Sequence, residues 1–330
     1  MSAIAISLGD PAGIGPEITA KAWEQRERHK LTPFFAVGDP RSIEAVWGGN
    51  VVRITDPGEA QVAFRVGLPV LQIEDAGEII PGRPDIEGAR CSLDALEVAA
   101  GIARSGAASA LVTGPVSKTQ LYAVGFRHPG QTEFVAERCG ISPENAIMLL
   151  AGPTLKVVPM TTHMPLRDVA DTLSIELIVA RGIATAKGLT RNFGIAQPRL
   201  AFAGFNPHAG ENGALGREEI DLLIPAMEIL REQGINVAGP FAADAMFHKR
   251  ARARYDVAMC LYHDQALIPL KTLHFDEGVN MTLGLPFVRT SPDHGTAFDI
   301  AGTDSAEPGA MIAALRMAAS AAKHRAAAAV

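Results

Sequence analysis

The chain has 330 residues, of which 48% are hydrophobic and 20% charged, so it can bury a sizeable core and is not globally disordered. Its formal charge is -6, from 30 Lys and Arg against 36 Asp and Glu, and only 5% of its residues are aromatic. These values argue against binding nucleic acid through bulk charge or base-stacking platforms. At about 150 residues per domain, the length suggests roughly two domains.

The remaining compositional features exclude several further classes of protein. Three cysteines, Cys91, Cys139 and Cys260, lie far apart without a CxxC pair, which argues against a disulfide framework or a cysteine-rich zinc site. The N-terminal sequence MSAIAISLGD lacks the basic and apolar stretches of a signal peptide. No uncharged run of about 18 apolar residues exists to cross a membrane. We therefore expect a cytoplasmic protein without membrane contact.

Short apolar runs alternate with amphipathic stretches along the chain. Strands are predicted at 4–8, 34–37, 110–112, 147–150, 155–159, 200–203 and 257–261, and helices at 93–104, 175–193, 217–233 and 308–329. Alternating strands and helices predict an α/β protein with mainly parallel sheets. Without repeats or a flexible linker, residues 1–330 read as one two-lobed unit whose lobe boundary the sequence does not reveal.

Glycine clusters follow three of the predicted strands, at 9–16, 113–115 and 204–210. In open α/β sheets, ligands bind beyond the carboxyl ends of the strands. Gly9, Gly13 and Gly15 have the spacing G-x3-G-x-G, which differs from the dinucleotide fingerprint G-x-G-x-x-G. A tight turn that starts a helix near Pro16 is the favoured interpretation, and a substrate or phosphate loop is the alternative.

Three histidines each follow a strand-like run directly: His163, His208 and His263. Three imidazoles at strand ends can converge on one divalent ion and leave positions open for substrate. Imidazole suits zinc, cobalt, nickel or iron, and a neighbouring carboxylate such as Asp264 widens the choice toward manganese or magnesium. A hydrogen-bonding structural role is the alternative for each histidine.

A dense polar run occupies the C-terminal third of the chain. Lys271, Asn280 and Arg289 carry donors suited to carboxylate or phosphate oxygens. A charged surface hairpin is the alternative, although 279–286 is too apolar for a purely solvated loop. The segment 293–297 is predicted to open a helix and to offer backbone N–H groups to an anion.

Several long motifs in this sequence resemble the 4-hydroxythreonine-4-phosphate dehydrogenase family. They are LGDPAGIGPEI, TGPVSK, TEF, TTHMPLRDV, NPHAGE, GREEID, YHDQALIPLK and GVNMTLGLPFVRTSPDHGTAFDIAG, and they extend from Ile4 to about Gly302. The resemblance implies two α/β/α lobes with a cleft between them, similar to the isocitrate and isopropylmalate dehydrogenases. It also implies a homodimer with a shared active site, and NAD or NADP bound without a Rossmann glycine motif.

The resemblance also implies roles for individual residues. The metal ligands would be His163, His208 and His263, holding one divalent ion such as Zn, Mg or Co. Substrate contacts would come from Gln131, Thr132, Lys271, Asn280 and Arg289. Candidates for the catalytic base are Lys271 and Asp244, and candidates for cofactor binding are Asp293, His294, Gly295 and Thr296.

Two of these assignments carry alternatives. Gln131 departs from the family, which has histidine there; glutamine keeps an N–H donor, adds an acceptor and cannot be protonated near neutral pH. Asp244 is also a candidate cap for a helix beginning at Ala245.

The activity implied by the resemblance is oxidation of 4-phosphooxy-L-threonine at C3 by NAD(P), followed by decarboxylation to 3-amino-2-oxopropyl phosphate, in pyridoxine 5'-phosphate biosynthesis. Relatives that act on four-carbon sugar-acid phosphates (threonate or erythronate 4-phosphate) or on aromatic cis-dihydrodiols provide an alternative. A catalytically silent metal- or nucleotide-binding protein is a further one. Lys271, Asn280 and Arg289 favour a small phosphorylated substrate without separating an amino acid from a sugar acid.

Overall fold

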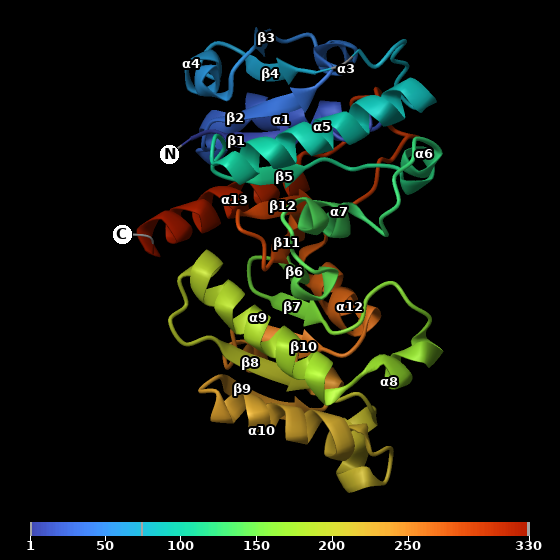
Figure 1. Ribbon diagram of the computed structural model, residues 1–330, viewed down its shortest axis with the longest axis vertical. Helices are drawn as coiled ribbons and strands as arrows, with labels where there is room; N and C mark the ends of the chain where they lie inside the picture. The colour runs from blue at the N-terminus through green and yellow to red at the C-terminus, as the bar shows by residue number, and fades with distance from the viewer. Residues whose placement is uncertain (1, 74, 329–330) are drawn as a thin grey trace. The chain divides into compact units, whose positions relative to one another are not determined.

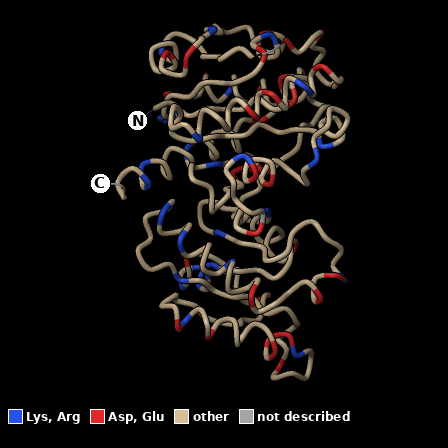
Figure 2. Tube along the Cα trace, in the orientation of Figure 1, with Lys and Arg blue, Asp and Glu red and all other residues tan. Residues whose placement is uncertain are grey.

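The computed structural model describes residues 2–73 and 75–328, and the chain divides into two compact units. Unit 1 consists of Met1–Ile141 and Leu285–Lys323, and unit 2 of Ser142–Gly284 and His324–Val330. Acidic and basic residues are scattered over both units (Figure 2). No helix in the described part of the chain is long and apolar enough to cross a membrane.

The described residues of unit 1 form six strands, and every neighbouring pair within it is parallel. In spatial order they are β3 (Val51–Ile54), β4 (Leu68–Gln72), β2 (Phe34–Gly38), β1 (Ile4–Ser7), β5 (Leu111–Thr113) and β12 (Arg289–Pro292). Parallel strands covered on both faces are continuously apolar, and β1 and β2 are buried at every position.

The helices that begin in unit 1 are α1 (Gly15–Glu24), α2 (Arg26–His29), α3 (Pro40–Glu44), α4 (Ala60–Ala63), α5 (Ile86–Ser105), α6 (Lys118–Ala123), α7 (Gln131–Arg138) and α13 (Gly309–Ala328). Helix α5, with 20 residues, crosses in front of β1 and β5 (Figure 1). Asp85 caps its start by accepting a 2.7 Å hydrogen bond from the Gly88 N–H, and Gly106 ends it with a φ of 82°.

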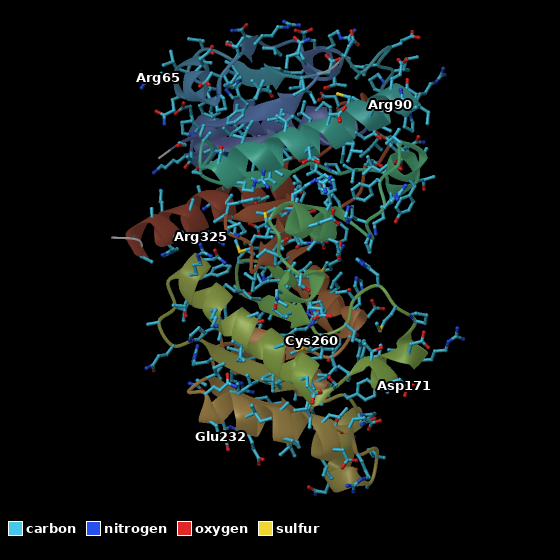
Figure 3. The ribbon with its side chains drawn as sticks, viewed as in Figure 1. Arg65, Arg90, Asp171, Glu232, Cys260 and Arg325 are labelled. Carbon is cyan, nitrogen blue, oxygen red and sulfur yellow. The ribbon has the colours of Figure 1, made fainter. Side chains whose placement is uncertain are left out.

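The part of unit 2 that the structure describes also has six strands, in the order β11 (Val279–Leu283), β6 (Ile147–Ala151), β7 (Lys156–Pro159), β10 (Val257–Cys260), β8 (Arg199–Ala203) and β9 (Asn236–Phe241). Antiparallel pairing joins β11, β6 and β7, whereas β7, β10, β8 and β9 are parallel. Its helices are α8 (Val169–Thr172), α9 (Ile175–Phe193), α10 (Ile224–Glu232), α11 (Lys249–Arg252) and α12 (His263–His274). Cys260, labelled in Figure 3, is the fully buried last residue of β10.

The predicted α/β architecture with mainly parallel sheets is confirmed, and each of the seven predicted strands is present. The sequence did not predict strands β3, β4, β9, β11 and β12. Strand β3 is half-exposed, and β4 and β9 contain proline. Strands β11 and β12 lie in the polar C-terminal run. The charged surface hairpin proposed for that run is therefore wrong, since β11 and β12 are largely buried.

The predicted helices are also present, with one internal difference. The stretch 217–233 forms a π turn over Glu219–Leu223 before α10, because Pro225 cannot donate to a regular helical ladder. The predicted C-terminal helix corresponds to α13, and its expected last residue, Ala329, lies outside the described residues.

Candidate active site

Arg289, the first residue of β12, is the centre of a polar site in unit 1. It is only 3% exposed, and its guanidinium donates from Nη1 to Thr132 Oγ1 at 3.0 Å and from Nη2 to Thr113 Oγ1 at 2.6 Å. Burial lowers its pKa to about 10, against the opposing effect of the Glu133 carboxylate, so the group is a cation at neutral pH. The two hydroxyls orient this cation without adding negative charge, an arrangement suited to an anion.

Gln131 and Thr132 occupy the first turn of α7, beside the end of β5. The Gln131 Nε2 donates to the Gly114 carbonyl at 3.1 Å, while no described donor bonds its buried Oε1. Glutamine therefore uses the N–H donor that it shares with histidine to bond Gly114. Its remaining group, Oε1, is an acceptor. Together with the Arg289 bonds, this contact ties the strand end at 113–114 to the helix start at 131–132.

The first glycine cluster follows β1 and forms the tight turn that starts α1, as the favoured interpretation predicts. Pro16 lies in the first turn of α1, where a missing N–H costs nothing. Asp10 is 2% exposed, and its Oδ1 accepts from the Ala12 N–H at 3.0 Å. Burial raises the pKa of Asp10 to about 6; the Ala12 hydrogen bond opposes this rise and the Asp85 carboxylate adds to it.

The candidate cofactor residues directly follow β12 and are Asp293, His294, Gly295 and Thr296. Contrary to expectation, this segment does not open a helix: it consists of bends and irregular backbone, and α13 begins only at Gly309. Ala297 has a left-handed φ of 42°, which interrupts any helical run at that point. The Thr296 carbonyl accepts a 3.0 Å hydrogen bond from the Ile14 N–H of the first glycine loop.

Unit 2 brings His163 and His263 together at the neighbouring ends of β7 and β10. The Met160 N–H donates to the Cys260 carbonyl at 2.7 Å, and Thr161 Oγ1 donates to the Leu261 carbonyl at 2.9 Å. The two imidazole centroids consequently lie 5.8 Å apart. Both rings line a cavity of about 610 Å³, here called the histidine cavity, together with Thr162, Met164, Pro165, Leu166, Val169, Tyr262 and Asp264.

Asp264 belongs to this cavity, although the sequence assigned it no role beyond widening the choice of metal. Its Oδ1 lies 2.8 Å from His263 Nδ1, which fixes the ring and leaves Nε2 as the atom for a ligand bond. The signal available in the sequence was its position directly after His263.

His208 follows β8 on a separate, unusual loop. It is the first of six consecutive residues with positive φ angles, ending at Gly213. Buried Glu219 holds this loop by accepting from the Asn206 N–H at 2.8 Å and from Asn206 Nδ2 at 3.0 Å. Gln265 connects the ends of β8 and β10, because it accepts from the Leu261 N–H at 2.7 Å and donates to the Gly204 carbonyl at 2.8 Å.

The three predicted metal ligands are thus only partly assembled. Within 2–73 and 75–328, no three His, Cys, Asp or Glu side chains form a group that could hold a metal ion. The pair His163 and His263 fits as part of a ligand set, and the three-histidine site stays a prediction.

The other predicted site residues of unit 2 lie on three different elements. Lys271 is on α12, with its Nζ 5.9 Å from the Phe275 ring centroid. Asn280 is in β11 opposite Leu150, and its buried Oδ1 accepts from no described donor. Asp244 is exposed within a 3₁₀ turn at Ala243–Ala245; the helix predicted to begin at Ala245 is wrong, because the next helix, α11, begins at Lys249 with His248 as its cap.

Fold and site together define the class: an α/β protein with mainly parallel strands, a buried arginine in one unit and a histidine-lined cavity in the other. Residues 30–318 match the family model described as pyridoxal phosphate biosynthetic protein PdxA, and the chain belongs to this family.

Individual relatives agree with this assignment. A Zymomonas mobilis protein named 4-hydroxythreonine-4-phosphate dehydrogenase is 56% identical over 98% of this chain and 97% of its own length. The crystal structure of the protein of that name from Klebsiella pneumoniae superposes with a TM-score of 0.87 at 35% identity, covering 98% of this chain and all of the other. A terephthalate 1,2-cis-dihydrodiol dehydrogenase from Burkholderia xenovorans has a TM-score of 0.67 at 29% identity, covering 97% of this chain and 98% of its own.

Proposed function

We propose that this protein oxidises 4-phosphooxy-L-threonine at C3 with a nicotinamide cofactor, and that the product loses carbon dioxide to give 3-amino-2-oxopropyl phosphate for pyridoxine 5'-phosphate biosynthesis. The observation that carries the proposal is the buried Arg289 guanidinium, oriented by Thr113 and Thr132 in a chain whose relatives are named for a phosphorylated substrate. Either NAD or NADP serves as the oxidant.

The proposed task of unit 1 is to bind and orient the phosphate. Arg289 and Thr132 offer donors to phosphate oxygens, and Gln131 holds the start of α7 in place through Gly114. Lys271 and Asn280 of unit 2 are proposed as further substrate contacts. Binding energy from the phosphate positions the reacting carbon, which raises the rate of the chemical step.

The proposed task of the unit 2 histidines is to hold one divalent ion, with His163 and His263 as the pair already close together and His208 as the third ligand. When bound, such an ion supplies positive charge that lowers the pKa of the substrate hydroxyl. Asp264 keeps the His263 ring oriented for this purpose. Zinc, magnesium and cobalt all suit the proposal.

The remaining steps move a proton and a hydride. A base takes the C3 hydroxyl proton, and Lys271 and Asp244 are the two candidates. A bound nicotinamide would supply the hydride acceptor for the oxidation of C3 to a carbonyl. The resulting β-keto acid breaks its bond to the carboxylate and releases carbon dioxide. The residues proposed to contact the cofactor are Asp293, His294, Gly295 and Thr296.

Assembly and location are also part of the proposal. A homodimer with a shared active site follows from the family resemblance, and it would supply the ligand that the described part of one chain does not bring next to His163 and His263. Light scattering of the active protein tests this, since full activity in a monomer would contradict it. The cytoplasmic location stays a prediction from the sequence.

A second candidate substrate class keeps the fold and the cofactor. Two observations support a sugar-acid phosphate or a cis-dihydrodiol as the alternative substrate. One is the similarity to a cis-dihydrodiol dehydrogenase, and the other is the Gln131 Oε1 acceptor, which no donor among the described residues bonds. The deciding experiment compares kcat/KM for 4-phosphooxy-threonine, threonate 4-phosphate, erythronate 4-phosphate and an aromatic cis-dihydrodiol. We expect 4-phosphooxy-threonine to be preferred, and a clear preference for any of the others would overturn the substrate assignment.

A further inference from the structure

The segment between β12 and α13, residues 293–308, contains neither a helix nor a strand. Loops of this length inside a compact unit are uncommon and are usually functional. Most of its residues are exposed or half-exposed, with Ala301, Ala306 and Pro308 as buried exceptions. Because few apolar contacts are available to it, polar contacts must determine its conformation.

The start of this segment is held by the loop before α1. The Ile14 N–H donates to the Thr296 carbonyl at 3.0 Å. Gly13 permits this approach, because a Cβ atom there would lie only 3.1 Å from the Thr296 carbonyl oxygen. A side chain at Gly13 would therefore displace the residues proposed to contact the cofactor.

The end of the segment is held by the Glu17 carboxylate in the first turn of α1. Glu17 is only 2% exposed, and each of its oxygens accepts from a different backbone N–H: Oε1 from Ala306 at 3.1 Å and Oε2 from Gly302 at 3.2 Å. Both oxygens are needed for this pair of contacts, so a single acceptor cannot replace the carboxylate.

Lys21, one helical turn after Glu17, adds a second connection. Its Nζ donates to Glu17 Oε1 at 2.9 Å and to the carbonyls of Asp304 and Ala306 at 2.7 and 2.9 Å. The same ammonium lies 2.9 Å from Asp304 Oδ1. Glu17 and Lys21 thus bind both the N–H groups and the carbonyls of residues 302–306, and together we call them the α1 latch.

We propose that Glu17, assisted by Lys21, is a positioning residue for the nicotinamide cofactor: the α1 latch fixes the 293–308 segment in the conformation that binds the dinucleotide. The inference rests on the proposed function, in which residues 293–296 contact the cofactor. A segment ordered before binding loses less conformational entropy when the cofactor arrives, so the latch favours cofactor affinity. Glu17 itself does not touch the reacting atoms in this account.

The test uses Glu17→Gln in the full-length protein. The amide keeps one acceptor but replaces the other with an N–H₂ group that faces a backbone donor, so one loop contact must be lost. We expect the KM for NAD(P) to rise about tenfold, as for the loss of one charge-assisted hydrogen bond, while the KM for the phosphorylated substrate and kcat change little. Amide hydrogen exchange in 297–308 should become faster in the same variant.

Two further variants keep the test decisive. Lys21→Met leaves both Glu17 contacts with the backbone and should give a smaller rise in the cofactor KM, which also covers the case in which Glu17→Gln fails to fold. Glu97→Gln, which breaks the exposed ion pair with Arg138 in the same unit, is the matched control and should leave the cofactor KM unchanged.

The outcomes separate this inference from the proposed function. A wild-type protein without NAD(P)-linked oxidation would contradict the proposed function itself. An active wild type whose cofactor KM is unchanged by both Glu17→Gln and Lys21→Met would overturn the role of the α1 latch alone. Equal losses in cofactor KM, substrate KM and kcat would also overturn it, because they would indicate a general structural role.

Discussion

The Arg289 site of unit 1 and the histidine cavity of unit 2 differ in how far the chain itself fixes their geometry. Arg289 is 3% exposed, and two threonine hydroxyls hold its guanidinium. His163 and His263 line an open cavity, in which Asp264 forms a hydrogen bond with the His263 ring. One site is oriented before any ligand arrives, and the other brings together two of three expected ligands.

This contrast follows from the chemistry that each site is proposed to perform. A guanidinium that binds a phosphate has a higher affinity when it is rigidly oriented, because its donors must match the oxygens of a tetrahedral anion. Imidazoles that bind a metal ion need not be ordered beforehand, since the bonds to the metal supply the energy that orders them. The predictions below test whether the two sites divide the work in this way.

The largest effect is expected from removing a histidine of the cavity. His163→Ala or His263→Ala should reduce turnover by about a thousandfold or more, the size expected when a group that stabilises developing charge is lost. Metal analysis of the purified variants should show that bound metal falls in parallel, with thermal stability retained. His29→Ala on α2 is the control and should behave as wild type; variants of His163 and His263 that remain loaded and active would contradict the metal site.

Arg289→Lys should produce the next largest loss. Lysine keeps the charge but not the fork that contacts both Thr113 and Thr132, so productive binding should weaken by roughly 1–3 kcal/mol. The measurement is kcat/KM on phosphorylated and dephosphorylated substrate, with the surface change Arg138→Lys as a control. Equal losses on the two substrates would show that Arg289 does not recognise the phosphate.

Asp264→Asn should have an intermediate effect, confined to the metal. The amide bonds His263 more weakly than the carboxylate does, so metal affinity should fall about tenfold, and saturating metal should restore turnover. Metal titration of activity measures this, and Asp171→Asn on α8 (Figure 3) is the control in the same unit. An unchanged metal affinity would remove Asp264 from the site.

The smallest effects are expected at Gln131. Gln131→His should leave substrate preference unchanged and alter turnover only a few-fold, because histidine can also donate to the Gly114 carbonyl. Gln131→Ala should cost more, since it removes the contact that connects α7 to the end of β5. The measurement is kcat/KM for 4-phosphooxy-threonine and the sugar-acid phosphates; a reversal of preference in Gln131→His would show that this position selects the substrate.

The sequence predicted the fold well where burial dominates. Strands such as β1 and β10 are continuously apolar because both faces are covered, and helix α9 matches its predicted range of 175–193. The strands that escaped prediction carry polar residues or proline, as in the sequence RTSP of β12. Their pairing depends on neighbours that are distant in the chain, which local patterns do not report.

The site residues were predictable as types but not as an arrangement. Strand-end histidines and the donors near Arg289 were visible in the sequence, and the motifs supplied their roles. Three contacts depend on the folded conformation. They are the hydrogen bond from Gln131 to Gly114, the contact of Asp264 with His263, and the hydrogen bonds of Glu17 in the α1 latch with residues 302 and 306. The expected helices at 245 and 293–297 failed because short polar segments form turns as readily as helix starts.

The most direct test of the whole account is a chelation-and-restoration assay on the wild-type protein with 4-phosphooxy-threonine and NAD(P). We expect chelated protein to be inactive, and we expect added zinc, cobalt or magnesium to restore reduction of the nicotinamide. Carbon dioxide should then be released in equal amount to the reduced nicotinamide. Full activity after complete removal of metal, or no nicotinamide reduction with any of the three ions, would contradict it.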